Sequence, residues 1–231
     1  MPSLRLIAWN CRSGALTTRL SELAEHSPDI VFLQECAPAR NLTPGHNFAA
    51  RSINKSKGIA LGSLSADYRF TKLRARPGAG KAAIAGSVTG PVSFTALGIW
   101  SQGPGYAADA MRSLDAYGNL LRSGPAIVMG DLNSGTCLFR QEDVSKNHRR
   151  LTDALAAIGL VSAYHAFHKV DHGRETHATY RHQFKQQQPW HIDFCFVPAG
   201  WIEHLVEVQV VEDAWGLKSD HVPLKVDLRL P

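Results

Sequence analysis

The sequence lacks any apolar run near the roughly 20 residues that a membrane-spanning helix needs. It also shows no secretory signal, because Met1 is followed almost at once by the strand-like run LRLIAWN (residues 4–10). Its four cysteines form no CxxC pair, which argues against a zinc knuckle or a thioredoxin-like motif. We therefore expect a cytoplasmic protein without a membrane span, whose cysteines are small buried side chains in a reducing compartment.

Internal repeats, low-complexity segments and linkers are absent as well. The 231 residues therefore predict a single domain, residues 1–231, with a core large enough to need no disulfide staples. The run RPGAGKAA (76–83) slightly resembles a phosphate-binding loop. The pattern GxxxxGK[ST] requires other residues where Ala75 and Ala82 stand, which excludes a Walker-type site.

Positive charge is concentrated in one segment. The net charge is +5, but residues 51–81 contain eight basic residues and one acid, so that this segment carries +7 and the rest of the chain −2. Such a segment predicts an anionic partner, either a nucleic acid or another phosphorylated molecule. The alternative is a solvated basic loop region.

Apolar periodicity predicts an α/β fold. Residues 4–10 and 30–35 have the composition of buried strands, and 15–27 between them places leucines at helical spacing. This strand–helix–strand order is typical of α/β proteins. Further strands are predicted at 58–63, 68–75, 81–89, 92–100, 126–133, 191–198, 205–212 and 222–230, further helices at 106–123 and 148–160, and long loops at 40–56, 134–147 and 165–189.

Polar side chains recur where these apolar strands end. Asp131 and Asn133 follow a buried strand, and residues two apart on an extended chain point the same way. Buried carboxylates need a cation, a histidine or hydrogen-bond donors. Oxygen-rich side chains suit a hard cation such as Mg²⁺ or Mn²⁺ better than zinc.

Five such elements, WN (9–10), LQE (33–35), GDLN (130–133), HIDF (191–194) and SDH (219–221), occur in this order. The set resembles the endonuclease/exonuclease/phosphatase superfamily, and the resemblance extends from Leu4 to Leu228. It implies a four-layer α/β sandwich, with two mixed β-sheets packed face to face and flanked by helices. It also implies a metal-dependent hydrolase of phosphoester bonds.

The resemblance assigns roles to individual residues. Glu35 is the implied principal Mg²⁺ (or Mn²⁺) ligand, with Asn10 beside it, and Asp220 serves the metal directly or through water. A cation at this place would neutralise the anionic phosphodiester.

The implied catalytic residues are Asp131, Asn133, Asp193 and His221. Asp131 and Asn133 would orient the attacking water and the phosphate oxygens. His221 would contact the scissile phosphate, and Asp193 would accept its other ring proton and favour the imidazolium.

Two positions depart from the family pattern. Trp100 stands where the family usually has a histidine or tyrosine, and an indole cannot act as an acid. It either bonds or stacks on the substrate or is an apolar plug, and Tyr106, His177, Tyr180 or a metal-bound water would have to protonate the leaving group. Arg12 replaces an acidic residue of apurinic endonucleases and favours a phosphate contact.

The segment 165–191 contains six histidines, but at irregular spacings and without an HExxH motif. We interpret it as a polar or substrate-facing loop rather than a zinc site. Tyr180 lies in a threonine-aromatic element similar to one that commonly lies near the family's site, and it is predicted to bind substrate. Trp190, placed at the rim of the site, either stacks on a base or sugar of the substrate or packs in the core.

Three functions remain open at this stage. The first is a Mg²⁺-dependent nuclease acting on DNA or RNA. The second is a phosphatase or phosphodiesterase of a small phosphoester, such as a phosphoinositide, nucleotide or lipid headgroup, and the third is a catalytically silent binding module of the same fold. The oligomeric state is taken as monomeric by default.

Overall fold

The computed structural model describes residues 1–37, 47–138, 142–211 and 218–231. Its first sheet has the strand order β13-β14-β1-β2-β4-β3. These strands are β1 (Ser3–Asn10), β2 (Ile30–Cys36), β3 (Phe48–Ser52), β4 (Gly58–Ser63), β13 (Leu205–Val210) and β14 (Leu224–Arg229).

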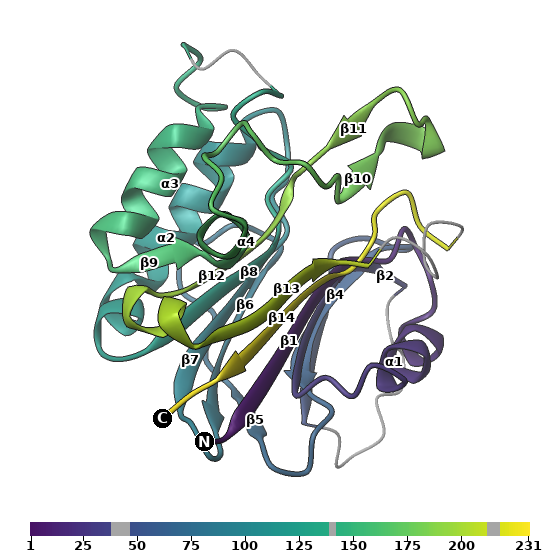
Figure 1. Ribbon diagram of the computed structural model, residues 1–231. Coiled ribbons are helices and arrows are strands. Elements are labelled where there is room, and N and C mark those ends of the chain that lie inside the picture. Colours follow the sequence, from purple (N-terminus) through teal and green to yellow (C-terminus); the bar gives the residue numbers. More distant parts are fainter. Residues whose placement is uncertain (38–46, 139–141, 212–217) are drawn as a thin grey trace.

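The second sheet has the order β5-β6-β7-β8-β12-β9. Its strands are β5 (Arg69–Lys72), β6 (Ala83–Thr89), β7 (Phe94–Ile99), β8 (Ala126–Asp131), β9 (Leu160–Ser162) and β12 (Asp193–Pro198). Both sheets are mixed: β1 pairs with β2, and β7 with β8, in parallel, whereas β2–β4 and β8–β12 are antiparallel. A short ribbon of β10 (Tyr180–Arg181) and β11 (Pro189–Trp190) projects beyond them (Figure 1).

Helices connect the parallel strands and cover the outer faces. Helix α1 (Leu16–Ala24) joins β1 to β2, and α2 (Tyr106–Arg122) joins β7 to β8, as parallel neighbours require. The other helical segments are α3 (His148–Ala157), α4 (Ala163–His168), η1 (His182–Phe184) and η2 (Ala199–His204). Among the described residues, we find no helix with the length and apolar character needed to cross a bilayer.

Alternating side chains of each strand build separate apolar layers. Phe32 faces the opposite sheet, whereas its neighbour Leu33 packs with α1 residues. On the other side, Phe196 of β12 packs with residues of α2 and α3. Figure 1 shows the resulting order of α1, sheet, sheet, and α2 with α3, which confirms the predicted four-layer sandwich.

The structure also differs from the predicted elements in places. Strand β3 falls within the expected loop 40–56, of which residues 40–46 lie outside the described part of the chain. The predicted helix 148–160 ends at Ala157, because Gly159 takes a positive φ of 78° and the chain continues into β9. The segment 165–189, expected to be irregular, contains the end of α4, η1 and the β10–β11 ribbon.

Candidate active site

The ends of strands from both sheets meet at one place. Asn10 ends β1 in one sheet and Asp131 ends β8 in the other, and both are 1% exposed. The Asn10 amide donates a hydrogen bond to Asp131 Oδ2 at 2.9 Å. The candidate site therefore lies where the carboxyl ends of β1 and β8 come together between the sheets.

A tight turn holds Asp131 and Asn133. Asp131 Oδ1 accepts the backbone N–H of Asn133 at 2.8 Å, and Oδ2 accepts the Asn133 side-chain amide at 3.2 Å. Asn133 has a φ of 47°, a left-handed conformation that asparagine tolerates. Gly130 precedes the turn at φ 135°, where a Cβ atom would lie 2.1 Å from the carbonyl oxygen of Ile99. The GDLN sequence thus fixes both side chains at the end of the strand.

The strand register explains why Asp193 lies beside Asp131. The two residues are direct partners in the antiparallel pair of β12 and β8. Asp193 Oδ2 is 2.9 Å from His221 Nδ1, and His221 Nε2 is 3.9 Å from Asp131 Oδ2. All three side chains are buried, and their ligand atoms lie within 4.8 Å of one another.

Burial and the charges of neighbouring groups shift the pKa values of Asp131 and His221. Burial, followed by the negative charge of Asp193, raises the pKa of Asp131 to about 7. Burial on its own would lower the pKa of His221, but the charges of Asp193 and Asp131 outweigh it and raise this pKa to about 9. At neutral pH His221 is therefore an imidazolium beside a carboxyl group that is partly ionised. A carboxyl group with a pKa near neutrality is suited to accept a proton from water.

Glu35 lies at a bulge near the end of β2. The pairing with β4 shifts register between Gln34 and Cys36, and Glu35 itself has a φ of 52°. Its carboxylate forms an ion pair with the ammonium of Lys57, which also lies 5.9 Å from the ring centroid of Trp100. Sequence reasoning missed Lys57 as a site residue, although it belongs to the basic segment and precedes β4, opposite the end of β2.

Arg12 and Asp220 form a second charged pair. Arg12 Nε is 3.5 Å from Asp220 Oδ1, and its guanidinium lies 4.5 Å from the ring centroid of Phe184. The backbone N–H of Arg12 donates to Asn10 Oδ1 at 3.1 Å, and the Ser219 hydroxyl donates to the Asn10 carbonyl at 2.7 Å. These bonds join the SDH segment to the end of β1.

Tyr180 connects the separate parts of the site. Its ring contacts that of His221 at an angle of 33°, with centroids 4.4 Å apart, and its hydroxyl is 2.6 Å from His182 Nδ1. Burial, and then the nearby charges of Asp220, Asp131 and Glu35, raise the pKa of the phenol to about 12. Carboxylates far apart in the chain therefore act on the same hydroxyl, which places the predicted residues in one neighbourhood.

Trp100 is 4% exposed and belongs to the core between the sheets. A stacking platform needs an accessible ring face, which this indole does not offer. Its buried Nε1 has no hydrogen-bond partner within the described part of the chain. Of the two predicted substrate contacts of Trp100, stacking and hydrogen bonding, only a hydrogen bond from this nitrogen is left. That contact stays a prediction.

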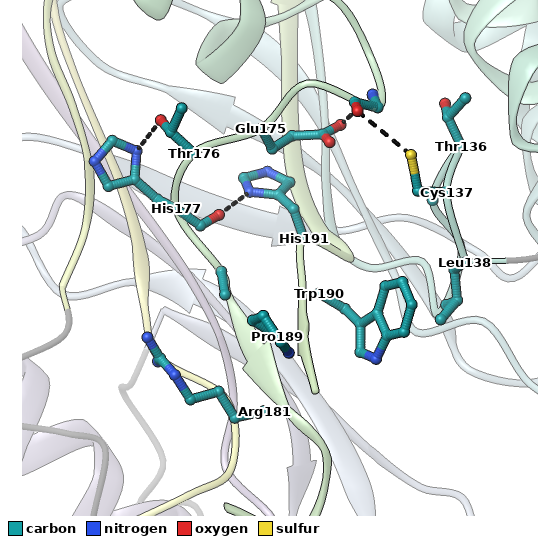
Figure 2. A pocket seen from close by; sticks show the side chains of 13 residues that line it. Thr136, Cys137, Leu138, Glu175, Thr176, His177, Arg181, Pro189, Trp190 and His191 are labelled. Carbon is teal, nitrogen blue, oxygen red and sulfur yellow. Dashed lines mark hydrogen bonds between the residues drawn. The ribbon is translucent and has the colours of Figure 1, made fainter. Parts of the chain in front are cut away.

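A cavity of about 430 Å³ is lined by residues from 135–138, 173–178, 181 and 189–191, and the trio of Asp131, Asp193 and His221 is not part of its lining (Figure 2). Trp190, Arg181 and Pro189 line it, and the position of Trp190 at the rim of the active site stays a prediction. Figure 2 shows the His177 ring directed toward Thr176, and His177 Nδ1 is also 2.8 Å from the Tyr164 hydroxyl. These bonds hold His177 to its own loop.

The sequence of the chain matches a known protein family. Residues 7–221 match the model of the Endonuclease/Exonuclease/phosphatase family. The chain belongs to this family. It is a family of phosphoester hydrolases, so the chain is an enzyme of that class. No curated protein sequence matches the chain closely enough to serve as a relative.

Solved structures of this family share the fold. A 3′-5′ exonuclease (NExo) from Neisseria meningitidis is 19% identical with a TM-score of 0.71, and a structure of 3′ phosphatase NExo from Neisseria bound to product DNA hairpin gives 19% and 0.68. An AP endonuclease from Archaeoglobus fulgidus is 18% identical with a TM-score of 0.71. Each comparison covers 98% of this chain and 100% of the other.

The donor atoms at the site fit a hard divalent cation. Asn10, Glu35 and Asp220 offer oxygen atoms, the ligands that Mg²⁺ and Mn²⁺ prefer. Glu35 and Asp220 each meet a cationic side chain, Lys57 and Arg12, so these positions already accommodate positive charge. Asp131, Asp193 and His221 form another group whose ligand atoms are close enough to hold an ion.

Proposed function

We propose that this enzyme is a nuclease that hydrolyses phosphodiester bonds of DNA or RNA with the help of Mg²⁺ or Mn²⁺. The observation that carries this proposal is the buried Asp131–Asp193–His221 trio, joined to Asn10 by the hydrogen bond from the Asn10 amide to Asp131. The core shared by both sheets supports the further proposal that residues 1–231 act as one domain.

The chain's own groups suit an in-line attack by water. Asp131, with its raised pKa, accepts a proton from the water, and Asn133 helps to orient it. The His221 imidazolium, held by Asp193, donates a hydrogen bond to a phosphate oxygen where negative charge develops. When bound by Glu35 with Asn10 and Asp220, the divalent cation would neutralise the phosphate.

The leaving oxygen needs a proton donor, and Tyr180 is the residue we assign to this role. Its phenol carries a proton at neutral pH, as every tyrosine does, and the rise of its pKa to about 12 makes that proton harder to release until negative charge develops on the leaving oxygen. Its ring contacts that of His221, and the charges of Asp131 and Asp220 act on its hydroxyl, whereas Trp100 has no titratable proton near neutrality.

The cavity supports a nucleotide-containing substrate. Trp190 can stack on a base and Arg181 can bind a phosphate, two contacts that nucleic-acid-binding proteins combine. Solved relatives in fold are described as an exonuclease, an AP endonuclease and a 3′ phosphatase bound to a DNA hairpin. A volume of about 430 Å³ also matches a small ligand, which favours a small phosphoester as the second candidate.

The basic residues of segment 51–81 do not form one continuous positive surface beside the site. Of its eight basic residues only Lys57 bonds a predicted site residue, and the other seven are exposed. Arg69 pairs with Thr89, the last residue of β6. The other end of β6 is the one near the site, since Ala83 there pairs with Ile99, the neighbour of Trp100. Arg69 therefore lies at the end of the sheet away from the site. The segment therefore spreads along the sheet.

A substrate panel tests the proposal. Supercoiled plasmid, an abasic duplex, single-stranded RNA, inositol phosphates and a chromogenic phosphodiester would each be incubated with Mg²⁺, Mn²⁺ or chelator. Cleavage of polymers that weakens steeply with added salt is expected, because bound phosphates release counterions. Activity on the small esters alone would support the second candidate.

Matched variants identify the source of any activity. Asp131→Asn is expected to be inactive at every metal concentration, and Glu35→Gln to recover partly in excess Mn²⁺. The exposed Asp153→Asn serves as the control and should match the parent. Full activity of Asp131→Asn, or polymer cleavage that persists in chelator, would contradict the proposed mechanism.

A further inference from the structure

Several of the histidines of segment 165–191 gather into one cluster, in spite of their irregular spacing. His165 is in α4, and His172 and Glu175 are in the loop that follows. One ligand atom from each of these three residues lies within 4.8 Å of the other two. The His165 and His172 rings are stacked with centroids 3.6 Å apart, and His165 Nε2 is 2.9 Å from Glu175 Oε1.

His191 completes the cluster from the other side. Its ring centroid is 5.9 Å from that of His165. His191 Nδ1 donates to the His177 carbonyl at 2.9 Å, which leaves a lone pair on the buried Nε2. Neither His191 Nε2 nor His172 Nδ1 has a hydrogen-bond partner within the described part of the chain, although both atoms are buried. Buried polar atoms are normally paired, so these two nitrogens require an explanation.

The tautomer of His191 matches that of a metal-binding imidazole. A metal-bound histidine usually donates its other ring N–H to a carbonyl or carboxylate, as His191 does toward His177. His165 Nδ1 is 2.7 Å from the Ser162 hydroxyl. Binding through His165 Nε2 would replace the hydrogen bond between this nitrogen and Glu175, and it requires the tautomer in which Nδ1–H donates to Ser162.

We propose that His165, His172 and Glu175 bind one transition-metal ion of the Zn²⁺ type, with His191 as an additional ligand. Imidazole nitrogens with one carboxylate suit Zn²⁺ better than Mg²⁺, whose ligands are oxygens. This site is separate from the oxygen-rich group around Glu35. Because Glu175 and His191 also line the 430 Å³ cavity, the ion would fix the cavity wall opposite Trp190 (Figure 2).

Zn²⁺ titration followed by calorimetry tests this site. The parent for the experiment is the full chain with Glu35→Gln and excess Mg²⁺ present, which suppresses Zn²⁺ binding at the oxygen-rich site. We expect one equivalent of Zn²⁺ to bind, and His172→Ala in this background to weaken binding at least 100-fold. His204→Ala, a histidine in η2 outside the cluster, is the matched control and should bind like the parent.

Two further measurements test whether nitrogen atoms bind the metal and whether each variant keeps its fold. Co²⁺ would report nitrogen ligation through its visible absorption, which should disappear in His172→Ala and persist in His204→Ala. Circular dichroism of each variant would show that the fold is retained; should His172→Ala fail to fold, Glu175→Gln replaces it with the same expectation. Absence of Zn²⁺ binding in the parent, or equal affinity in the cluster variant and the control, would overturn the proposal.

Discussion

Replacing Asp193 by asparagine would remove the charge that holds His221 in its protonated form while keeping a hydrogen-bond acceptor of the same shape. In the protein the pKa of His221 is about 9, compared with 6.5 for an unperturbed histidine. Each pKa unit corresponds to 1.36 kcal/mol, so the surroundings favour the imidazolium by about 3 kcal/mol. Asp193 supplies the largest part of the effects that raise this pKa, against the lowering effect of burial.

We expect the pKa of His221 in Asp193→Asn to fall by about two units, to its ordinary value or below. Asp131 would offset part of the loss, because it lies 3.9 Å from Nε2 and its own pKa would decrease once the Asp193 charge is gone. Histidine NMR signals followed as a function of pH measure the change directly. The rate of phosphodiester hydrolysis should fall by about 10²–10⁴ at pH 8, where the ring would have lost its proton.

The effect of Asp193→Asn on the free energy of unfolding should depend on pH in a defined direction. A group whose pKa is raised on folding stabilises the protein fully below its unfolded pKa, and this contribution is lost as the pH rises through about 9. Asp193→Asn should therefore lower the free energy of unfolding in urea by about 2–3 kcal/mol at pH 6 and by much less at pH 10. A His221 signal that still titrates near pH 9 in the variant, or an equal loss of stability at both pH values, would refute this account of the trio.

Three other substitutions test the fold, the charge pair and the cavity. Gly130→Ala should destabilise the protein by about 3 kcal/mol in urea, because its Cβ would lie 2.1 Å from a carbonyl oxygen at φ 135°, whereas Gly124→Ala, with open space around it, should be neutral. Lys57→Met should tighten Mn²⁺ binding a few-fold by calorimetry, since the Glu35 carboxylate loses its protein counter-charge; unchanged or weaker binding would argue against Glu35 as a ligand. Trp190→Ala should raise KM for a nucleic acid about tenfold through lost stacking and leave hydrolysis of a small chromogenic phosphodiester unchanged, and equal effects on both substrates would contradict a base contact.

The sequence was most informative where the site depends on strand ends. Asn10 and Asp131 could be predicted because polar residues directly after apolar strands are visible in one dimension, and parallel strands bring their carboxyl ends to one edge. The direct pairing of Asp193 with Asp131 could not be predicted, because it depends on the register between β12 and β8. Lys57 was missed for a similar reason, since its ion pair with Glu35 forms across two strands and leaves no local pattern.

The histidine segment shows a different limit of sequence reasoning. Zinc motifs are recognised by regular spacing, which arises when ligands lie on one helix or one knuckle. Here His165 comes from a helix, Glu175 from a loop and His191 from the residues just before a strand. Tertiary packing brings them together, so irregular spacing did not exclude a cluster. Strand β3 was missed because the run FAARS is short, lies at the sheet edge and has little alternation of apolar and polar residues.

The site itself follows from a connection that the fold uses twice. In each sheet a helix links two parallel strands, α1 between β1 and β2 and α2 between β7 and β8, so each sheet has an edge where carboxyl ends collect. Packing the sheets face to face brings these edges together, as the bond between Asn10 and Asp131 shows. One sheet then supplies Glu35 and Asn10, whose oxygens suit a cation, and the other supplies Asp131 and the partner of His221. Because the two sets of residues belong to different sheets, a change in the packing between the sheets would separate the proposed metal ligands from the proposed base.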